Sequence, residues 1–190
     1  MSANTYQLKI TLQEIRPAVW RRVQVPGTLS LAGLHYVIQI AFGWTDSHLH
    51  EFCVGPRRYG FPDEMDVETE DDSAVTLEEA VGPGINHFRY VYDFGDDWLH
   101  DVKVEKVLAS DLTRPAVSCL AGRRKCPPED SGGPWGYTQL LEAIRDPGNP
   151  DHRELLGWVG GPFDPEYFDL DAVNRELVEL FSKPALGAAV

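Results

Sequence analysis

The stretch YVYDFGDDWLH, residues 90–100, decides how the middle of this sequence folds. Aromatic residues alternate with other residues on both sides of a Gly-Asp-Asp segment, a pattern typical of two strands joined by a short turn. A loop at residues 95–97 gives the hairpin one apolar and one charged face, whereas a shorter turn mixes charge into both faces. That register pairs Phe94 with Trp98, Tyr92 with His100, Tyr90 with Val102 and Phe88 with Val104.

This register assigns the polar residues of the stretch to different faces. Asp93 is expected on the solvent face and His100 on the aromatic, inward face, so the two are poor partners for one metal ion. The letters DFG also occur in protein kinases, but the sequence has neither a glycine-rich phosphate loop nor an HRD-type catalytic loop. We therefore interpret DFG as part of a turn and His100 as a buried histidine, structural or functional.

Hydrophobic periodicity predicts the remaining elements. Alternation over residues 6–12, 19–25 and 48–54 predicts three strands. Ser30 and Gly43 delimit a helix between the second and third of these strands. A short helical turn is expected at residues 76–80, and three helical segments in the last third contain Tyr137 to Ile144, a capping box of Asp151 and Glu154, and Leu170 to Phe181.

These elements predict an α+β fold with an antiparallel or mixed sheet of early strands, a helix after the second strand and a helical C-terminal third. A chain of 190 residues fits a single domain, with its core at residues 6–181. The acidic run at residues 63–72 is expected to be a solvated loop, with a calcium loop as the weaker alternative. Residues 182–190 are expected to form a flexible tail.

The net charge and the cysteine content restrict the binding partners and the cellular location that the sequence predicts. A net charge of -13 disfavours binding to nucleic acid through general electrostatic attraction. No signal peptide is visible, and the uncharged segment at residues 28–45 has a helical period and polar residues, so no membrane span is expected. Three cysteines argue against a disulfide framework. The sequence therefore predicts a cytoplasmic protein that is not bound to membranes.

Histidines supply the candidate metal ligands. His48 and His50 share one face of a predicted strand and can chelate a divalent ion if a third ligand approaches. We predict His100 as that ligand, with Glu129 or Asp130 adding a carboxylate. The sequence assures no cofactor, but a divalent metal is the candidate. The expected binding pocket contains Arg21, Trp44, His48, His50, His100, Glu129 and Asp130.

Cysteine chemistry is a weaker alternative. Cys119 and Cys126 are separated by LAGRRK, which is longer than the usual spacing of a zinc knuckle, and Cys53 is the only other cysteine. The basic residues at positions 123–125 would lower the pKa of a nearby thiol, so a catalytic cysteine is a further hypothesis.

Five motifs resemble the plasmid pRiA4b ORF-3-like family. They are IRPAVWRRV at residues 15–23, LHYVIQIAFGWTDSHLHEF at 34–52, YVYDFGDDWLHDVKVE at 90–105, CPPEDSGGPWGY at 126–137 and FDPEYFDLDAVN at 163–174. The resemblance runs from about Tyr6 to Leu180 and implies a compact α+β domain. It also implies an association with mobile elements, since some members carry a TnpR-like label. It implies no specific activity and no catalytic residues.

Three functions follow as hypotheses. The first is a small binding or accessory module, because the polar motif residues form no complete catalytic set. The alternative is a metal-dependent hydrolase or nuclease that uses His48, His50 and His100 with Glu129 or Asp130. DNA recombination is the third, but before residue 40 the only serines are Ser2 and Ser30, and the chain is acidic. Whether the protein is an enzyme stays open, as do its partners.

Overall fold

A computed structural model describes residues 4–62, 68–109 and 115–182. Predictions for residues 63–67 and 183–190 lie outside these ranges. The strands are β1 (Asn4–Leu12), β2 (Trp20–Pro26), β3 (His50–Val54), β4 (Arg57–Gly60), β5 (Thr69–Asp71), β6 (His87–Tyr92), β7 (Trp98–Ala109) and β8 (Ser118–Arg123). The helices are α1 (Leu31–Phe42), α2 (Leu77–Val81), α3 (Gly133–Arg145), α4 (His152–Trp158) and α5 (Leu170–Phe181).

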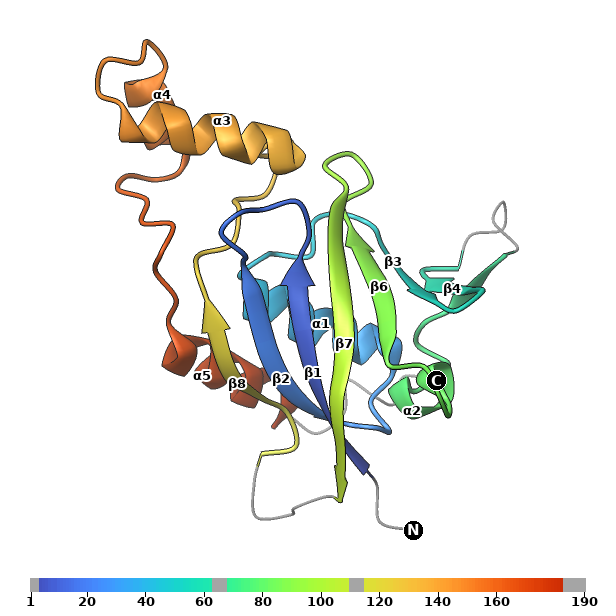
Figure 1. Ribbon diagram of the computed structural model, residues 1–190. Helices are drawn as coiled ribbons and strands as arrows, with labels where there is room; N and C mark the ends of the chain where they lie inside the picture. The colour runs from blue at the N-terminus through green and yellow to red at the C-terminus, as the bar shows by residue number, and fades with distance from the viewer. Residues whose placement is uncertain (1–3, 63–67, 110–114, 183–190) are drawn as a thin grey trace.

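The strands form one sheet in the order β5-β4-β3-β6-β7-β1-β2-β8. Neighbouring strands are antiparallel except for the pair β4 and β5, which is parallel. Helix α1 lies behind the sheet and α5 lies beside β8 (Figure 1). The α+β prediction, with a mixed sheet and a helical C-terminal third, is therefore confirmed.

Helix α1 covers the centre of the sheet and begins and ends where its sequence indicates. The side chain of Ser30 accepts a hydrogen bond from the backbone N–H of Gly33, and Gly43 ends the helix in the left-handed conformation. Its inward face carries Leu34 and Ile38, both fully buried, but also the buried polar residue His35. A buried histidine in an apolar helix face requires hydrogen-bond partners. Those of His35 are Tyr90 and Asp46.

The hairpin of β6 and β7 corrects the predicted register by two residues. Tyr92 pairs with Trp98 and Tyr90 with His100. Because the shift is even, the aromatic side chains and His100 remain on the buried face, as predicted. Strand β6 ends earlier than expected because Asp93 has a φ of 57° and its side chain accepts hydrogen bonds from the backbone of the turn.

Two residues of the turn therefore lie elsewhere than predicted. Phe94, expected in the core, is 56% exposed. Asp93, expected on the solvent face, is buried. The side chain of Asp93 forms an Asx turn by accepting a hydrogen bond from the backbone N–H of Gly95. This turn takes the place of the next pair of backbone hydrogen bonds between the strands, and Phe94 therefore lies outside the sheet.

The described part of the acidic run is not a simple solvated loop. Residues 69–71 form the edge strand β5 alongside β4. Glu70 pairs with Arg57 across this edge, and Asp72 is buried. Pairing with β4 thus orders residues 69–71, although their acidic composition alone predicts a solvent-exposed loop.

Local capping also differs from expectation at one helix. Asp151 makes no side-chain capping bond, because its own backbone is already helical. The capping box occurs instead at α2, between Thr76 and Glu79.

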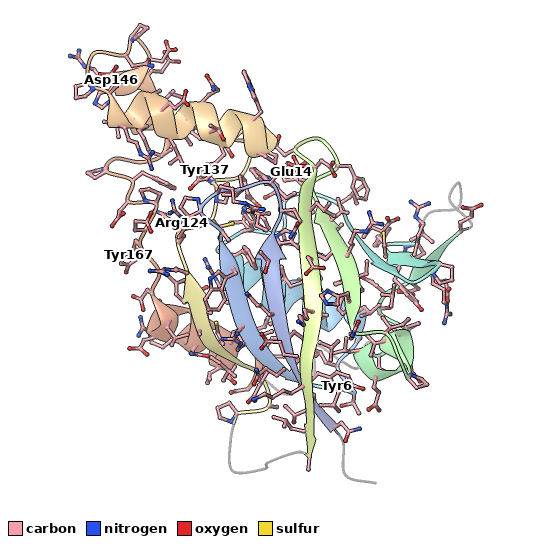
Figure 2. All side chains as sticks on the ribbon, viewed as in Figure 1. Tyr6, Glu14, Arg124, Tyr137, Asp146 and Tyr167 are labelled. Carbon is pink, nitrogen blue, oxygen red and sulfur yellow. The ribbon has the colours of Figure 1, made fainter. Side chains whose placement is uncertain are left out.

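Helices α3 and α4 extend from one end of the sheet (Figure 1). Tyr137 is buried on the side of α3 that faces the sheet, and Arg124 lies in the segment that leads to this helix (Figure 2). Arg124 forms an ion pair with Glu166 of the segment that returns to α5. In the described ranges, no helix combines the length and the apolar character needed to cross a membrane.

Candidate metal-binding pocket

An open pocket of about 820 Å³ lies beside the N-terminal half of α1. Its walls come from α1, the segment between α1 and β3, the residues that follow β5 and the tip of the β6–β7 hairpin. The polar side chains that line it include His35, Asp46, Ser47, His48, His50, Asp72 and Asp93. Histidines and carboxylates from α1, the segment after it, the first residue of β3, the residue after β5 and the hairpin tip thus meet at one surface.

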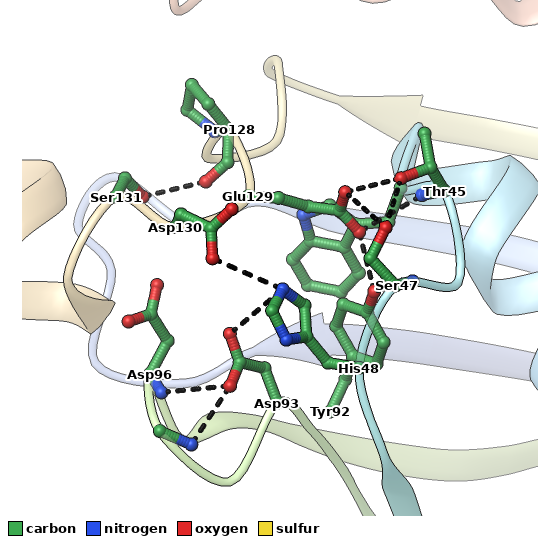
Figure 3. A network of polar contacts seen from close by, with 12 residues as sticks. Thr45, Ser47, His48, Tyr92, Asp93, Asp96, Pro128, Glu129, Asp130 and Ser131 are labelled. Atoms are coloured by element: carbon green, nitrogen blue, oxygen red, sulfur yellow. Dashed lines mark hydrogen bonds and ion pairs between the residues drawn. The ribbon is translucent and has the colours of Figure 1, made fainter.

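His48 is the centre of the first group of side chains. Its Nε2 atom lies 3.6 Å from Oδ2 of Asp93 and 3.3 Å from Oδ1 of Asp130 (Figure 3). The same nitrogen is buried and has no hydrogen-bond partner. An imidazole nitrogen faced by two carboxylate oxygens is a recognised set of donors for a divalent ion.

The Asp93 carboxylate of this group is positioned by the backbone of the turn that follows it. Oδ1 of Asp93 accepts hydrogen bonds from the backbone N–H groups of Gly95, at 2.9 Å, and Asp96, at 3.3 Å. Its other oxygen is thereby turned toward His48 (Figure 3). Asp93 and Asp130 both have a φ of 57°, a left-handed conformation that aspartate tolerates better than most residues.

The loop that carries Asp130 is anchored to the sheet through Glu129. The Tyr92 hydroxyl donates to Oε1 of Glu129 across 2.5 Å, and the Thr45 hydroxyl donates to Oε2 across 2.5 Å (Figure 3). The backbone N–H of Thr45 donates to the same carboxylate. The indole N–H of Trp44 donates to the carbonyl oxygen of Pro127 at 3.0 Å.

These contacts set the ionisation of the network. Burial acts to raise the pKa of Glu129, but hydrogen bonds from Thr45 and Tyr92 outweigh it and hold that pKa below its usual value. Burial, followed by the hydrogen bond to Glu129, raises the pKa of the Tyr92 hydroxyl. Glu129 is therefore an anion held by donors, and both its oxygens are engaged.

A second group lies in the same pocket. The imidazole rings of His35 and His50 stack with centroids 3.6 Å apart and an interplanar angle of 11°. Nε2 of His35 lies 2.8 Å from Oδ1 of Asp46, and Nε2 of His50 lies 2.7 Å from Oδ2 of Asp72. Potential ligand atoms of His35, Asp46 and His50 all lie within 4.8 Å of one another.

The three predicted histidine ligands, His48, His50 and His100, do not meet at one site. Among the described residues, the groups with ligand atoms within 4.8 Å of one another are His48 with Asp93 and Asp130, and His35 with Asp46 and His50. His100 belongs to neither, because β7 places it in the core, where its ring meets the rings of Phe42 and Trp44 edge-on. Neither group contains all three predicted ligands.

Arg21, which was predicted to line the pocket, lies outside it and holds parts of the fold together. Its buried guanidinium donates to the carbonyl oxygens of Ala41, Arg123 and Arg124 at 2.6, 3.0 and 2.9 Å. It also lies 4.1 Å from the ring centroid of Phe168. Arg21 thus joins β2, the end of α1, the segment after β8 and the approach to α5.

The cysteines have none of the features of an activated thiol. Cys119 and Cys126 are buried, and burial raises the pKa of both thiols. Burial, with a hydrogen bond to Glu51, raises the pKa of Cys53 to about 11. A nucleophilic cysteine requires a depressed pKa, so these surroundings do not fit the catalytic-thiol hypothesis.

Comparison with known proteins identifies the family. The sequence profile of the plasmid pRiA4b ORF-3-like proteins matches residues 4–172. The chain belongs to the plasmid pRiA4b ORF-3-like family. The resemblance of the five sequence motifs is confirmed.

Two relatives of this family member are similar over nearly their whole lengths. The uncharacterized protein y4hQ of Sinorhizobium fredii (strain NBRC 101917 / NGR234) is 41% identical over 186 residues, which cover 96% of this chain and 95% of that protein. The crystal structure of MM3350 from Methanosarcina mazei Go1, a protein of unknown function, has a TM-score of 0.83 and 35% identity, and the match covers 90% of this chain and 98% of that one.

Sequence reasoning on this pRiA4b ORF-3-like chain missed four residues of the pocket. They are His35, Asp46, Asp72 and Asp93. His35 carried one usable signal, a histidine within the apolar face of a helix. The three aspartates resembled ordinary turn and loop residues, because nothing in their local sequence indicates which histidine each one meets.

Proposed function

We propose that this protein is a divalent-metal-binding module whose ion is bound by His48, Asp93 and Asp130. One observation carries the proposal: a buried Nε2 atom of His48, without a hydrogen bond, faces two carboxylate oxygens. Without an ion, such a nitrogen would be expected to move into hydrogen-bond contact with one of the carboxylates.

The distances between these ligand atoms fit a shared tetrahedral ion. Two ligands of one tetrahedral ion, each about 2.1 Å from it, lie about 3.4 Å from each other. The Nε2 atom of His48 is 3.6 Å from Asp93 and 3.3 Å from Asp130, which brackets this value. Nitrogen and carboxylate donors without cysteine suit Zn²⁺, Mn²⁺, Fe²⁺ or Ni²⁺.

The arrangement supports binding more than hydrolysis. The hydrolase hypothesis asks for a free carboxylate that accepts a proton from metal-bound water. Glu129 is engaged by Thr45 and Tyr92 through both of its oxygens. We therefore propose that Glu129 positions the loop that carries Asp130, and that the protein acts as a binding or accessory module.

Calorimetric titration of untagged, metal-free protein with Zn²⁺ and with Mn²⁺ tests this function. We expect saturable binding that is strongly weakened in His48→Gln and in Asp93→Asn. His87→Gln is the matched control, because His87 also lies beside a carboxylate, Asp101 at 3.2 Å, but is exposed on the sheet surface. Absence of saturable binding, or equal loss in the control, would overturn the proposal.

We further propose that the protein acts in the cytoplasm, a setting that suits the free thiols of all three of its cysteines. Its association with mobile elements remains a hypothesis that the family name motivates. DNA binding measured across salt concentrations tests a direct role, since phosphate contacts weaken steeply as salt rises. With a net charge of -13, we expect no such salt-dependent binding.

A further inference from the structure

Exposed apolar side chains gather at the same pocket that holds His48. Tyr36, Leu49, Phe61 and Phe94 line this pocket, and their exposed fractions range from 44% for Tyr36 to 74% for Phe61. They come from α1, the residue before β3, the residue after β4 and the turn of the β6–β7 hairpin. We call these four side chains the apolar rim. Large apolar side chains that gather at one place on the surface, instead of being scattered singly, mark an interaction site.

Phe94 is the member of the apolar rim that the sequence pattern assigns to the core. The Asx turn made by Asp93 places it outside the sheet, where it is 56% exposed. Its position forgoes the stabilisation that a buried phenylalanine contributes. Natural proteins break such a local rule mainly at functional sites, so the exposed ring supports a binding role for this end of the pocket.

The interior of the pocket is acidic. Four aspartates line it, namely Asp46, Asp71, Asp72 and Asp93. Among the described residues that line it there is no lysine and no arginine. Burial, followed by the charge on His50, lowers the pKa of His35 to about 4, so His35 is neutral at pH 7 and leaves the charge of Asp46 uncompensated. Such a pocket attracts a cation.

The pocket has room for more than the proposed ion. Its volume of about 820 Å³ lies within the range of about 300–1,000 Å³ that is typical of pockets for organic ligands. An ion held by His48 would neutralise Asp93, but Asp46, Asp71 and Asp72 are not among its ligands. These three carboxylates would still attract a positively charged group.

Aromatic rings beside carboxylates favour a guanidinium group. A guanidinium stacks on aromatic faces and donates paired hydrogen bonds to carboxylates, so it can use the apolar rim and the aspartates together. Asp46 is accessible for such a contact, because its side chain is 39% exposed although one oxygen lies 2.8 Å from Nε2 of His35. Apolar residues on either side of an arginine in a peptide would find contacts on the apolar rim.

We propose that the apolar rim and the aspartates of the pocket form a docking site for an arginine-containing segment of a partner protein. The guanidinium enters the pocket, and the apolar residues that flank it pack on Tyr36, Leu49, Phe61 and Phe94. The inference goes beyond the proposed function and does not depend on it, because neither the apolar rim nor Asp46 binds the proposed ion.

Calorimetric titration with blocked tripeptides tests the docking site. The protein is kept metal-free with a chelator, so the result does not depend on the ion. The probes carry a central arginine flanked on each side by leucine, phenylalanine or tyrosine, in all combinations. We expect saturable binding of at least one of them, weaker at high salt and at least about tenfold weaker when uncharged citrulline replaces the arginine.

Two variants localise the binding. Phe94→Ser should weaken it by about 2- to 5-fold through loss of the aromatic face. Asp46→Asn should weaken it by about 10-fold, and asparagine tolerates the left-handed backbone at this position, where φ is 56°. The matched controls are Trp135→Ser, which removes an exposed aromatic ring outside the pocket, and Asp151→Asn, which removes an exposed carboxylate that makes no capping bond.

Three results would overturn the proposal. They are no saturable binding of any tripeptide, equal affinity for the citrulline peptide, and losses in the controls as large as those in Phe94→Ser and Asp46→Asn. Acetylated arginine amide, a single blocked residue, serves as a further probe. If it binds as tightly as the best tripeptide, the apolar flanks contribute nothing, and docking of a protein segment is overturned in favour of a small guanidinium compound.

Discussion

The hydroxyl of Tyr92 donates a hydrogen bond to Oε1 of Glu129 across 2.5 Å and accepts one from the backbone N–H of Ser47 at 3.0 Å. Tyr92 is a fully buried core residue of β6, whereas Glu129 precedes Asp130 in the loop. The contact therefore joins the sheet, the segment that carries His48 and the loop that carries Asp130 at one oxygen atom. The geometry of the proposed metal site depends on this junction.

Removing this hydroxyl should weaken metal binding more than it weakens the fold. In Tyr92→Phe, Glu129 loses a donor and Asp130 loses its fixed distance from His48. Loss of a residue that orients ligands typically reduces metal affinity by about 10- to 100-fold, and we expect a loss in that range by calorimetric titration. Tyr167→Phe is the control, because the exposed Tyr167 hydroxyl also donates to a carboxylate, that of Asp169. Unchanged affinity in Tyr92→Phe would contradict the role assigned to the junction.

Glycine should be required at position 133 for stability, because the loop that carries Asp130 there packs against the turn of the β6–β7 hairpin. A Cβ atom at Gly133 would lie 2.5 Å from the carbonyl oxygen of Asp96, and its φ is 67°. Gly160 also has a positive φ, 80°, but a Cβ atom there would meet nothing within 4 Å. Both alanine variants should lose about 1–2 kcal/mol from the left-handed backbone, and Gly133→Ala should lose more because of the clash. Urea denaturation measures the difference, and equal losses would contradict it.

His100 should make stability fall as the solution becomes acidic. Burial lowers its pKa in the folded state to about 3, while an unfolded histidine titrates near 6.5. Between these values the unfolded chain binds a proton that the folded chain does not, so stability is lost as pH falls from about 6.5 toward 3. For one proton the free energy of unfolding should fall by about 1.4 kcal/mol per pH unit.

Denaturation of metal-free protein at several pH values checks this slope. His100→Gln should flatten it, whereas His87→Gln, a variant of an exposed residue, should leave it unchanged. A slope that is the same in the wild type and His100→Gln would show that His100 does not contribute. His35, whose pKa is also lowered by burial, acts in the same direction and should preserve part of the slope.

Two adjacent arginines should differ in their effect on stability. Arg21→Lys cannot reproduce the planar set of donors to Ala41, Arg123 and Arg124, and a buried acceptor left unpaired costs about 1–3 kcal/mol. Arg22 lies on the partly exposed face, where it pairs with Glu105 at 2.6 Å. Arg22→Lys should therefore cost less than about 1 kcal/mol by thermal or urea denaturation. A larger loss in Arg22→Lys than in Arg21→Lys would contradict these assignments.

Periodicity was sufficient to predict much of the fold. The alternation in β1 and β2, and the Ser30 and Gly43 boundaries of α1, are local signals whose physical causes act within a few residues. The faces of the β6–β7 hairpin were predictable for the same reason. Its exact pairing was not, because an even shift keeps every side chain on its face and hydrophobicity alone cannot distinguish the two registers.

The sequence by itself determined that histidines and carboxylates were available, and it named His48 and Asp130, which the fold brings within 3.3 Å. Only the tertiary structure decided the groupings: Asp93 with His48, and His35 stacked on His50. The physical reason is that ligand groups form across long separations in sequence. Strand order and hydrogen bonds such as that between Tyr92 and Glu129 set which side chains meet, and neither leaves a periodic pattern in the chain.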